Sequence, residues 1–383
     1  MPPTAALSAL CAVGSRRFSH QTKQTRDGRG VSMTLKMIQV GCGGFGAAWC
    51  ADFLPPNMRD GRIEPVAAVD VNPDALANAR QHLGLPAERC YTDLARAFDE
   101  NPADFATVVV PPDRHESVVD VALEHGCHIL SEKPIAHSLE AACRIARKVE
   151  RAGVRMAVTM SHRFRRDITC FREYVRDPAN GPLDYVVCRF TWDARHTDNT
   201  FRYTMEHPLL IDAAVHHLDL TADLTGAPCD SLFATTWRPS WTEMAGHCQG
   251  FVTMEAANGV HALYEGADAN RVGLNSWGRE YLRAECRDAT LILSHGRIER
   301  FTEGGAAPEG TGDALPLRDQ PKWANAWLVE KFCDWVEGGP VMETQVEANL
   351  QSVALVFGAI ESSRTGQPVQ VQQLLDEARA ASV

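Results

Sequence analysis

The strongest constraint on the fold is a regular alternation of short β-rich apolar runs with stretches of helical length between residues 35 and 160. The apolar runs are KMIQV (36–40), EPVAAVDV (64–71), DFATVVV (104–110), CHILSEK (127–133) and RMAVTM (155–160). Parallel strands need long crossover connections, and helices of about a dozen residues supply them. The alternation therefore predicts an α/β domain over residues 35–160, built on a doubly wound parallel sheet.

The pattern changes after residue 182. Strand-like runs follow one another with little helix between them, at 183–195, 231–239, 250–256, 260–266, 279–286 and 289–294. Asn258-Gly259 lies between two of these runs and is a strong hairpin signal. Helical patterns return at 323–337 and 344–364. We expect residues 161–383 to form an α+β domain on an open, largely antiparallel sheet, with C-terminal helices that pack back on the first domain.

Size and composition restrict the possible functions. At 383 residues the chain exceeds the size at which one hydrophobic core stops growing, so two domains are expected. The formal net charge of −11 argues against nucleic-acid binding. No apolar run approaches the roughly 20 residues that span a bilayer. Twelve cysteines without a C-x-x-C pair indicate reduced thiols. These features favour a cytoplasmic enzyme with a small-molecule substrate.

The N-terminal segment differs from the rest of the chain. Residues 1–36 carry six Lys or Arg and one acid, Asp27, a composition that also occurs in organelle transit peptides. Met33 and Met37 lie next to the first predicted strand. We interpret residues 1–34 as a disordered extension or as the result of a start assigned too early.

A glycine-rich turn follows the first predicted strand. In VGCGGFG, Gly41, Gly43 and Gly46 form the G-x-G-x-x-G pattern, which allows a tight turn and a close approach of the backbone to pyrophosphate. Asp70 ends the second predicted strand, where a carboxylate binds the ribose hydroxyls of NAD and repels the 2′-phosphate of NADP. No Lys or Arg occupies positions 71–73. The motif predicts a site that takes NAD in preference to NADP.

A second landmark is needed, because methyltransferases use a similar turn and acid. The segment SEKPIA brings Glu132, Lys133 and Pro134 to the carboxyl end of the strand predicted at 127–133. Ligands of doubly wound sheets bind at this edge, so Lys133 is expected to point toward a bound nicotinamide. Pro134 restricts the backbone directly after the lysine.

The stretch HPLLIDAAVHHLDL (207–220) places two adjacent histidines in an apolar, helix-like run. Such side chains suit a metal site, a catalytic group or a buried helix with satisfied polar groups. Positions i, i+4, i+7 and i+11 share one face of a helix. The face built in this way is polar and contains Asp212, His216, Asp219 and Asp223. His217 falls on the opposite, apolar face and is interpreted as a packed histidine.

Taken together, these motifs resemble the Gfo/Idh/MocA family, the glucose–fructose oxidoreductase and inositol dehydrogenase group. The resemblance runs from about residue 36 to the C-terminus and rests on the glycine turn, on PPDRH and ALEHGCHILSEKP within 111–134, and on DAAVHHLD (212–219). It implies a Rossmann domain, a C-terminal α/β domain whose open sheet often mediates oligomer contacts, and NAD(P)-dependent chemistry on sugars and polyols. We expect a homo-oligomer, a dimer or a tetramer. Ala214 stands where many members have glycine.

The resemblance also implies site residues. His216, with a pKa near neutrality, is expected to act as general base, Asp212 to orient it, and Lys133 to stabilise the developing alkoxide. Expected cofactor contacts are Gly41, Gly43, Gly44, Phe45, Gly46, Asp70, Pro111, His115, Glu132 and Lys133. Expected substrate contacts are Lys133, Arg163, Trp192 and Asp219. No metal is expected, because hydride transfer to NAD needs none.

The expected reaction is hydride transfer between NAD and a secondary alcohol or ketone of a sugar, polyol or related compound. Two alternatives stay open. Some relatives bind NAD without turnover and act as regulators, and others use NAD transiently to cleave glycosides. The presence of Lys133, Asp212 and His216 counts against a regulator that lacks turnover.

Overall fold

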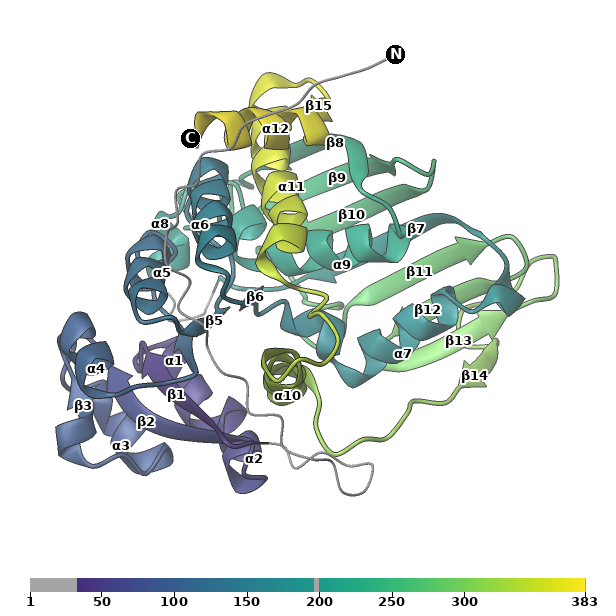
Figure 1. Ribbon diagram of the computed structural model, residues 1–383. Coiled ribbons are helices and arrows are strands. Elements are labelled where there is room, and N and C mark those ends of the chain that lie inside the picture. The colour runs from purple at the N-terminus through teal and green to yellow at the C-terminus, as the bar shows by residue number, and fades with distance from the viewer. Residues whose placement is uncertain (1–32, 196–199, 383) are drawn as a thin grey trace, which may run out of the picture. The chain divides into compact units, whose positions relative to one another are not determined.

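The computed structural model describes residues 33–195 and 200–382, and Thr34–Val383 forms one compact unit (Figure 1). The extension predicted at 1–34 lies outside the described residues, except for its last two positions. Two β-sheets organise the unit. Within the described ranges, no helix has both the length and the apolar composition needed to cross a membrane. The eleven cysteines in these ranges are free thiols.

The first sheet is parallel and six-stranded, in the order β3-β2-β1-β4-β5-β6. Its strands are β1 (Leu35–Val40), β2 (Ile63–Val69), β3 (Cys90–Tyr91), β4 (Phe105–Val108), β5 (His128–Ser131) and β6 (Met156–Val158). Chain order runs outward in both directions from the centre, between β1 and β4, so the predicted doubly wound sheet is confirmed. The sequence did not predict β3, because two residues form no recognisable apolar run.

Helices of the described ranges pack around both sheets. The α-helices are α1 (Phe45–Ala48), α2 (Pro55–Arg59), α3 (Leu76–His82), α4 (Leu94–Glu100), α5 (His115–Glu124), α6 (Leu139–Ala152), α7 (Arg166–Val175), α8 (Thr200–Thr204), α9 (Val215–Thr225), α10 (Ala324–Val336), α11 (Val346–Thr365) and α12 (Val371–Ala381). Short turns of other helix types are η1 (Trp49–Phe53), η2 (Ala87–Arg89), η3 (Ser161–Phe164), η4 (Pro178–Asn180) and η5 (Leu209–Ala214).

Local capping residues explain several helix boundaries. The Ser138 hydroxyl accepts a hydrogen bond from the backbone N–H of Ala141 and begins α6, which ends at the left-handed Gly153. Asn72-Pro73 combines an N-cap residue with a first-turn proline, a pattern that predicts a helix start, but helix α3 begins later, at Leu76. Residues 72–75 form a turn instead, because the Asn72 side chain accepts a hydrogen bond from the backbone N–H of Asp74.

The second sheet has nine strands, in the order β14-β13-β12-β11-β7-β10-β9-β8-β15. Its strands are β7 (Leu183–Thr191), β8 (Cys229–Trp237), β9 (Gln249–Ala256), β10 (His261–Ala267), β11 (Tyr281–Cys286), β12 (Thr290–Ser294), β13 (Arg297–Phe301), β14 (Asp313–Leu315) and β15 (Val369–Gln370). Neighbouring strands are antiparallel except for β7 and β10. The predicted open, largely antiparallel sheet is therefore confirmed, although β13, β14 and β15 were not predicted.

One face of the second sheet is covered by helices. Helices α9 and α11 pack across strands β7, β8 and β10 (Figure 1). Buried and exposed residues alternate along β8 and β9, as expected for a sheet with one packed face. The outward side chains include Phe233, Phe251 and Leu263, which are 41%, 48% and 37% exposed. The other face therefore exposes several large apolar side chains, with polar residues such as Thr253 between them.

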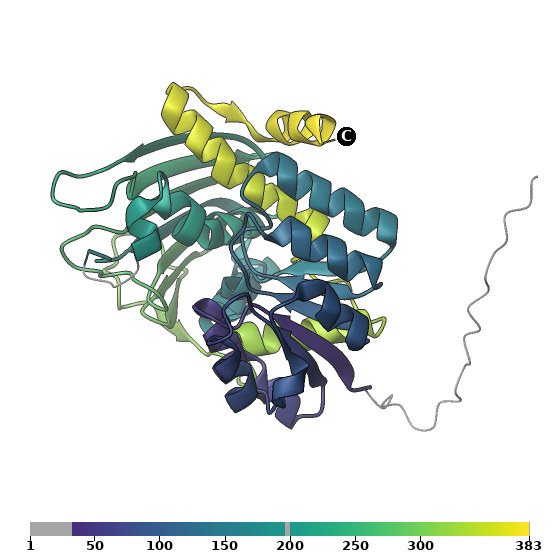
Figure 2. The ribbon, with the colours of Figure 1, turned by 90° about the vertical axis from the view of Figure 1, so that its left-hand side faces the viewer.

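The C-terminal helices hold the two sheets together. Phe332 of α10 is fully buried, and its ring centroid lies 5.4 Å from that of Phe105 in the parallel sheet. Helices α11 and α12 pack against α6, and Figure 2 shows them alongside it. Arg62 adds ion pairs to Asp334 and Glu337, each at 2.8 Å. Side chains from the carboxyl edge of the first sheet can therefore meet side chains of α9 in a fixed geometry.

Candidate active site

The glycine-rich turn connects β1 to α1 and has no room for side chains on its packed side. A Cβ atom on Gly41 would lie 2.0 Å from the carbonyl oxygen of Val109, and one on Gly46 would lie 2.3 Å from the carbonyl oxygen of Gly41. Gly44 has a φ of +51°, and no heavy atom lies within 4 Å of its Cβ position. A turn that is closed on one side and open on the other fits a dinucleotide pyrophosphate against its backbone.

Asp70 holds this turn in shape. Its Oδ2 atom accepts hydrogen bonds from the backbone N–H groups of Cys42 at 2.7 Å and Gly43 at 3.0 Å. Its Oδ1 atom accepts one from the N–H of Asn72 at 2.9 Å. Asp70 stands at the end of β2, next to the turn, which is the position from which the sequence predicts a ribose contact. The bonds to the turn are a role that the motif alone does not indicate.

The remaining predicted cofactor residues lie near the carboxyl edge of the parallel sheet. Phe45 is 55% exposed at the start of α1, and Pro111 is exposed after β4. Glu132 is buried, and the indole N–H of Trp49 donates a hydrogen bond to it at 2.9 Å. Burial raises the pKa of Glu132. Phe45 and Pro111 are thus accessible to a ligand, whereas Glu132 is held inside the protein.

His115 supports this edge from within. Its side chain is fully buried, and its ring nitrogens lie 2.9 Å and 3.0 Å from the carbonyl oxygens of Val110 and Ile135. The ring donates a hydrogen bond to one of these carbonyls and contacts the other, so it connects the end of β4 to the turn that follows Lys133. The structure therefore gives His115 a supporting position behind the predicted cofactor site.

Lys133 joins the two parts of the site. Its ammonium group donates to the carbonyl oxygen of Asp212 at 2.9 Å and to the Oδ1 atom of Asp212 at 3.2 Å. Arg202 of α8 donates to the other carboxylate oxygen. Burial raises the pKa of Asp212, but the positive charges of Lys133 and Arg202 outweigh it, so the pKa lies below its ordinary value. Asp212 is therefore ionised, and it contacts Lys133 rather than His216, which it was expected to orient.

The helical segment that carries Asp212 and His216 changes type between them. Residues Leu209–Ala214 form a π-helix, and the α-helix α9 begins at Val215. A π-turn closes i→i+5 hydrogen bonds, so the phase of an uninterrupted α-helix does not apply across it. The residues of the predicted polar face are buried or partly buried, and they contact two different groups. Asp212 contacts Lys133, whereas Asp219 and Asp223 contact Arg163.

His216 is 7% exposed, and its Nδ1 atom has no hydrogen-bond partner among the described residues. Burial, together with His162, Lys133 and His217, lowers its pKa well below 6.5. The predicted pKa near neutrality is therefore wrong. The physical reason is desolvation, which disfavours the charged form of the ring. At pH 7 the imidazole is neutral and able to accept a proton.

His217 is a packed histidine, as predicted. It is fully buried, stacks on Phe190 with ring centroids 4.6 Å apart, and places its Nδ1 atom 3.3 Å from the hydroxyl of Tyr264. Burial lowers its pKa to about 4.

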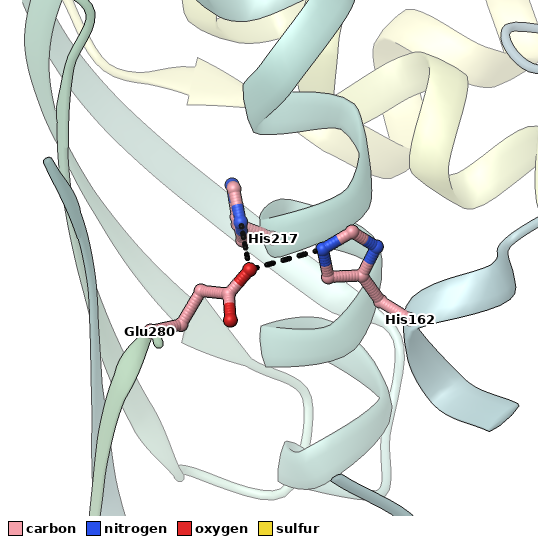
Figure 3. A group of neighbouring side chains, drawn as sticks. All are labelled: His162, His217 and Glu280. Atoms are coloured by element: carbon pink, nitrogen blue, oxygen red, sulfur yellow. Dashed lines mark hydrogen bonds and ion pairs between the residues drawn. The ribbon is translucent and has the colours of Figure 1, made fainter. Parts of the chain in front are cut away.

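His162, His217 and Glu280 form a buried cluster (Figure 3). The ring of His162 also stacks on that of His216. The Oε1 atom of Glu280 lies 3.2 Å from Nε2 of His162 and 3.7 Å from Nε2 of His217. The other oxygen accepts a hydrogen bond from Arg165 at 2.6 Å. A metal ion also uses such a set of atoms, but Arg165 already supplies the positive charge that Glu280 needs. His162 and Glu280 belong to no sequence motif, so neither was predicted as a site residue.

Two tryptophans border the site. The ring centroids of Trp192 and Trp277 lie 6.1 Å apart, and that of Trp277 lies 6.2 Å from His216. The Arg202 guanidinium lies 5.6 Å from the centre of the Trp192 ring. Both tryptophans are partly exposed. Trp192 is among the predicted site residues, whereas Trp277 lies in a segment without a pattern and was missed.

Arg163 and Asp219, both predicted to contact substrate, bind each other. The guanidinium of Arg163 donates to both carboxylate oxygens of Asp219, at 2.6 Å and 2.7 Å, and to Asp223 at 2.8 Å. The Ser352 hydroxyl also donates to Asp219. Burial raises the pKa of Asp223, but Arg163 and Arg172 outweigh it and lower the pKa to about 2. This arrangement favours a structural role for the pair.

Two models of one oxidoreductase family match the chain. Residues 35–160 match the model described as an NAD-binding Rossmann fold, and residues 181–371 match the model described as a C-terminal alpha/beta domain. The two matches fall on the two sheets and together cover most of the sequence.

Individual relatives cover nearly the whole chain. The uncharacterized protein y4oX of Sinorhizobium fredii is 50% identical over 357 residues, which are 91% of this chain and 99% of that protein. A D-apiose dehydrogenase of Paraburkholderia graminis is 26% identical, over 91% of this chain and 92% of its own. The fold is shared with a solved oxidoreductase of Agrobacterium radiobacter in complex with NAD+, L-tartaric acid and magnesium, with a TM-score of 0.79, 21% identity and coverage of 89% and 100%.

The structural role of Asp219 can be tested by stability. We expect Asp219→Ala to lower the free energy of unfolding by about 3–5 kcal/mol, because the buried guanidinium of Arg163 loses its bidentate partner. Urea denaturation followed by circular dichroism measures the change. The matched control is Glu361→Ala, which breaks an exposed pair with Arg364 and should cost less than about 1 kcal/mol. Equal, small effects of the two changes would show that Asp219 is not a structural anchor.

Proposed function

The chain belongs to the Gfo/Idh/MocA oxidoreductase family, and we propose that it transfers a hydride between NAD and a secondary alcohol or ketone of a sugar, polyol or related compound. The observation that carries this proposal is the 3.2 Å contact of Lys133 with Asp212 at the carboxyl edge of the NAD-binding sheet. His216, a neutral base, follows on the same helical segment. A cation and a base at one site are what proton removal from an alcohol requires.

The cofactor is bound by the edge of the parallel sheet. NAD, when bound, supplies the acceptor for the hydride. Gly41, Gly43 and Gly46 leave room for the pyrophosphate, and Gly44 and Phe45 face the open side of the turn. Asp70 holds the turn and presents its carboxylate to the adenosine ribose, which disfavours NADP.

His216 acts as the general base in alcohol oxidation. Because its pKa lies well below 6.5, the ring is unprotonated at pH 7. It takes the hydroxyl proton of the substrate, and in ketone reduction it returns this proton to the oxygen. The low pKa favours return of the proton from the protonated ring in ketone reduction.

Lys133 stabilises negative charge on the reacting oxygen. Its ammonium group is held by the carbonyl and carboxylate oxygens of Asp212, so it needs little reorganisation when the alkoxide charge develops. Asp212 thereby positions Lys133, a role that replaces its predicted contact with His216. Arg202 on the opposite side of the carboxylate keeps Asp212 ionised.

The substrate lies against Trp192 and Trp277. Their partly exposed rings lie at 74° to each other and offer an apolar corner beside the base, against which the apolar face of a sugar or cyclitol ring can pack. The relative named D-apiose dehydrogenase supports a sugar or polyol as substrate.

Self-association uses the open face of the second sheet, where Phe233, Phe251 and Leu263 are exposed. We expect a dimer or tetramer by light scattering, and we expect Phe251→Asp to convert it to monomers. A monomeric unmodified protein would contradict this proposal.

The two adjacent histidines separate catalysis from packing. We expect His216→Ala to lower kcat by about 10²–10⁴-fold, because the general base is lost, with NAD affinity near normal. His217→Ala, the matched control, should keep turnover and lose about 1–3 kcal/mol of stability, because buried Tyr264 loses its partner. Formation of NADH is followed by absorbance with a panel of sugars and polyols, NAD affinity by fluorescence quenching, and stability by thermal melting.

The same assay distinguishes the alternatives. A protein that binds NAD but produces no NADH with any member of the panel would be a regulator. Cleavage of a chromogenic glycoside without net NADH would identify an NAD-assisted glycosidase. Loss of turnover in a stable His217→Ala variant together with a nearly silent His216→Ala would remove His216 as the base.

The cofactor preference depends on Asp70. We expect NAD to bind more tightly than NADP, because the carboxylate repels a 2′-phosphate. Asp70→Ser should reduce this difference and also weaken NAD, since the N–H groups of Cys42 and Gly43 lose a charged acceptor. Fluorescence titration measures both dissociation constants, and Asp74→Ser, which removes an exposed acid nearby, is the control. Equal affinities of the unmodified protein for NAD and NADP would overturn the preference.

A further inference from the structure

His162 lies between the catalytic base and a buried carboxylate. It belongs to η3, which begins shortly after β6 at the carboxyl edge of the parallel sheet. One face of its ring stacks on His216, with centroids 4.4 Å apart and planes 28° apart. Its Nε2 atom lies 3.2 Å from Oε1 of Glu280 (Figure 3). His162 therefore contacts the base with its face and the carboxylate with its edge.

The protonation state of this arrangement follows from Glu280. Burial raises the pKa of Glu280, but the hydrogen bond from His162, the nearby ring of His217 and the charge of Arg165 outweigh it and hold the pKa far below its ordinary value. An ionised carboxylate only accepts hydrogen bonds, so the proton of His162 lies on Nε2. The Nδ1 atom of His162 has no hydrogen-bond partner among the described residues.

We propose that His162 and Glu280 are positioning residues for His216: Glu280 fixes the ring of His162, His162 fixes the plane of His216, and the Glu280 carboxylate offsets the charge that His216 gains with the proton. This inference rests on the proposed function of His216 as the base. In many enzymes, a carboxylate that accepts a hydrogen bond directly from the catalytic histidine orients its ring and stabilises its cation. The pair of His162 and Glu280 has this role here. Here the Nδ1 atom of His216 has no such bond.

The charges around His216 agree with this role. Lys133 faces it from the end of β5, with Asp212 of η5 bonded to that lysine. His162 faces it from η3, and His217 is its neighbour on α9. Burial and these three basic groups disfavour a proton on His216, and Glu280, next to β11, opposes them. Arg165 pairs with Glu280 on the far oxygen and with Asp167 at 2.8 Å.

The first experiment needs no substrate. Ring resonances of ¹⁵N-histidine in the full chain report the tautomer and pKa of each histidine, with His162→Phe and His216→Ala used for assignment. We expect His162 in the Nε2–H form. Glu280→Gln should lower the pKa of His216 by about 1, because an opposing negative charge is lost. Glu299→Gln, which changes a buried acid on β13, should leave the His216 resonances unchanged.

The second experiment uses kinetics, with NAD and whichever polyol of the panel is turned over, myo-inositol being the first probe. We expect Glu280→Gln and His162→Phe to lower kcat about tenfold with an unchanged KM for NAD, because the base is weaker and less well oriented. Glu280→Gln should also move the acid limb of kcat/KM to lower pH. Glu280→Asp keeps the negative charge, so the acid limb of kcat/KM should stay at the pH found for the unmodified protein. If Glu280 had only a structural role, the pH of this limb would not depend on its charge.

Several outcomes would overturn the inference. One is a folded Glu280→Gln variant whose His216 pKa and kcat equal those of the unmodified protein. Another is a stoichiometric transition metal, found by mass spectrometry, whose removal by chelator reproduces the Glu280→Gln effect, since the cluster would then be a metal site. If Glu280→Gln does not fold, His162→Phe tests the inference by its loss of kcat, with Glu280→Asp as the control that keeps the charge. A normal His216 response with no turnover of any panel member would instead overturn the proposed function.

Discussion

The contact between Lys133 and Asp212 is the constraint on which the site depends. The two residues are 79 positions apart, one at the edge of the parallel sheet and the other in the π-helix before α9. A 3.2 Å contact persists only where both backbones are held in place, and two hinged domains would not hold it. The last part of the chain provides this rigidity, because α10 packs Phe332 against the first sheet and α11 packs against both α6 and the second sheet.

Buried charged side chains beside the site are arranged in pairs. Arg163 binds Asp219, and Arg165 binds Glu280, so these two desolvated carboxylates each have a guanidinium beside them. Breaking such a pair is far more damaging than replacing it as a whole, which makes the pairs strong geometric anchors. His216 differs, because its ring is buried, neutral and unpaired at Nδ1. The paired charges set the geometry, and the unpaired ring is left to exchange a proton.

The fold could be predicted because its signals are local and repeated. Each strand of the parallel sheet except β3 coincides with an apolar run, and residues such as Ser138 and Gly153 mark helix ends by hydrogen bonds and backbone conformation that depend on near neighbours. The hairpin at Asn258-Gly259 joins β9 to β10 for the same reason. The wrong predictions lie where the local signal is weak or fits two structures. Asn72, for example, closes a turn where a helix cap was predicted.

The site could be predicted only as far as its motifs extend. Helical phase placed Asp219 on a polar face, but phase does not decide whether a buried carboxylate meets a substrate or Arg163, which approaches from 56 positions away. The π-helix could not be predicted from the sequence either, because tertiary packing selects the one additional residue in its turn. His162 and Glu280 are 118 positions apart and become neighbours only when η3 and the segment before β11 pack against α9. Functional contacts of this kind form only when η3, α9 and the segment before β11 pack together, so no single segment of the sequence predicts them.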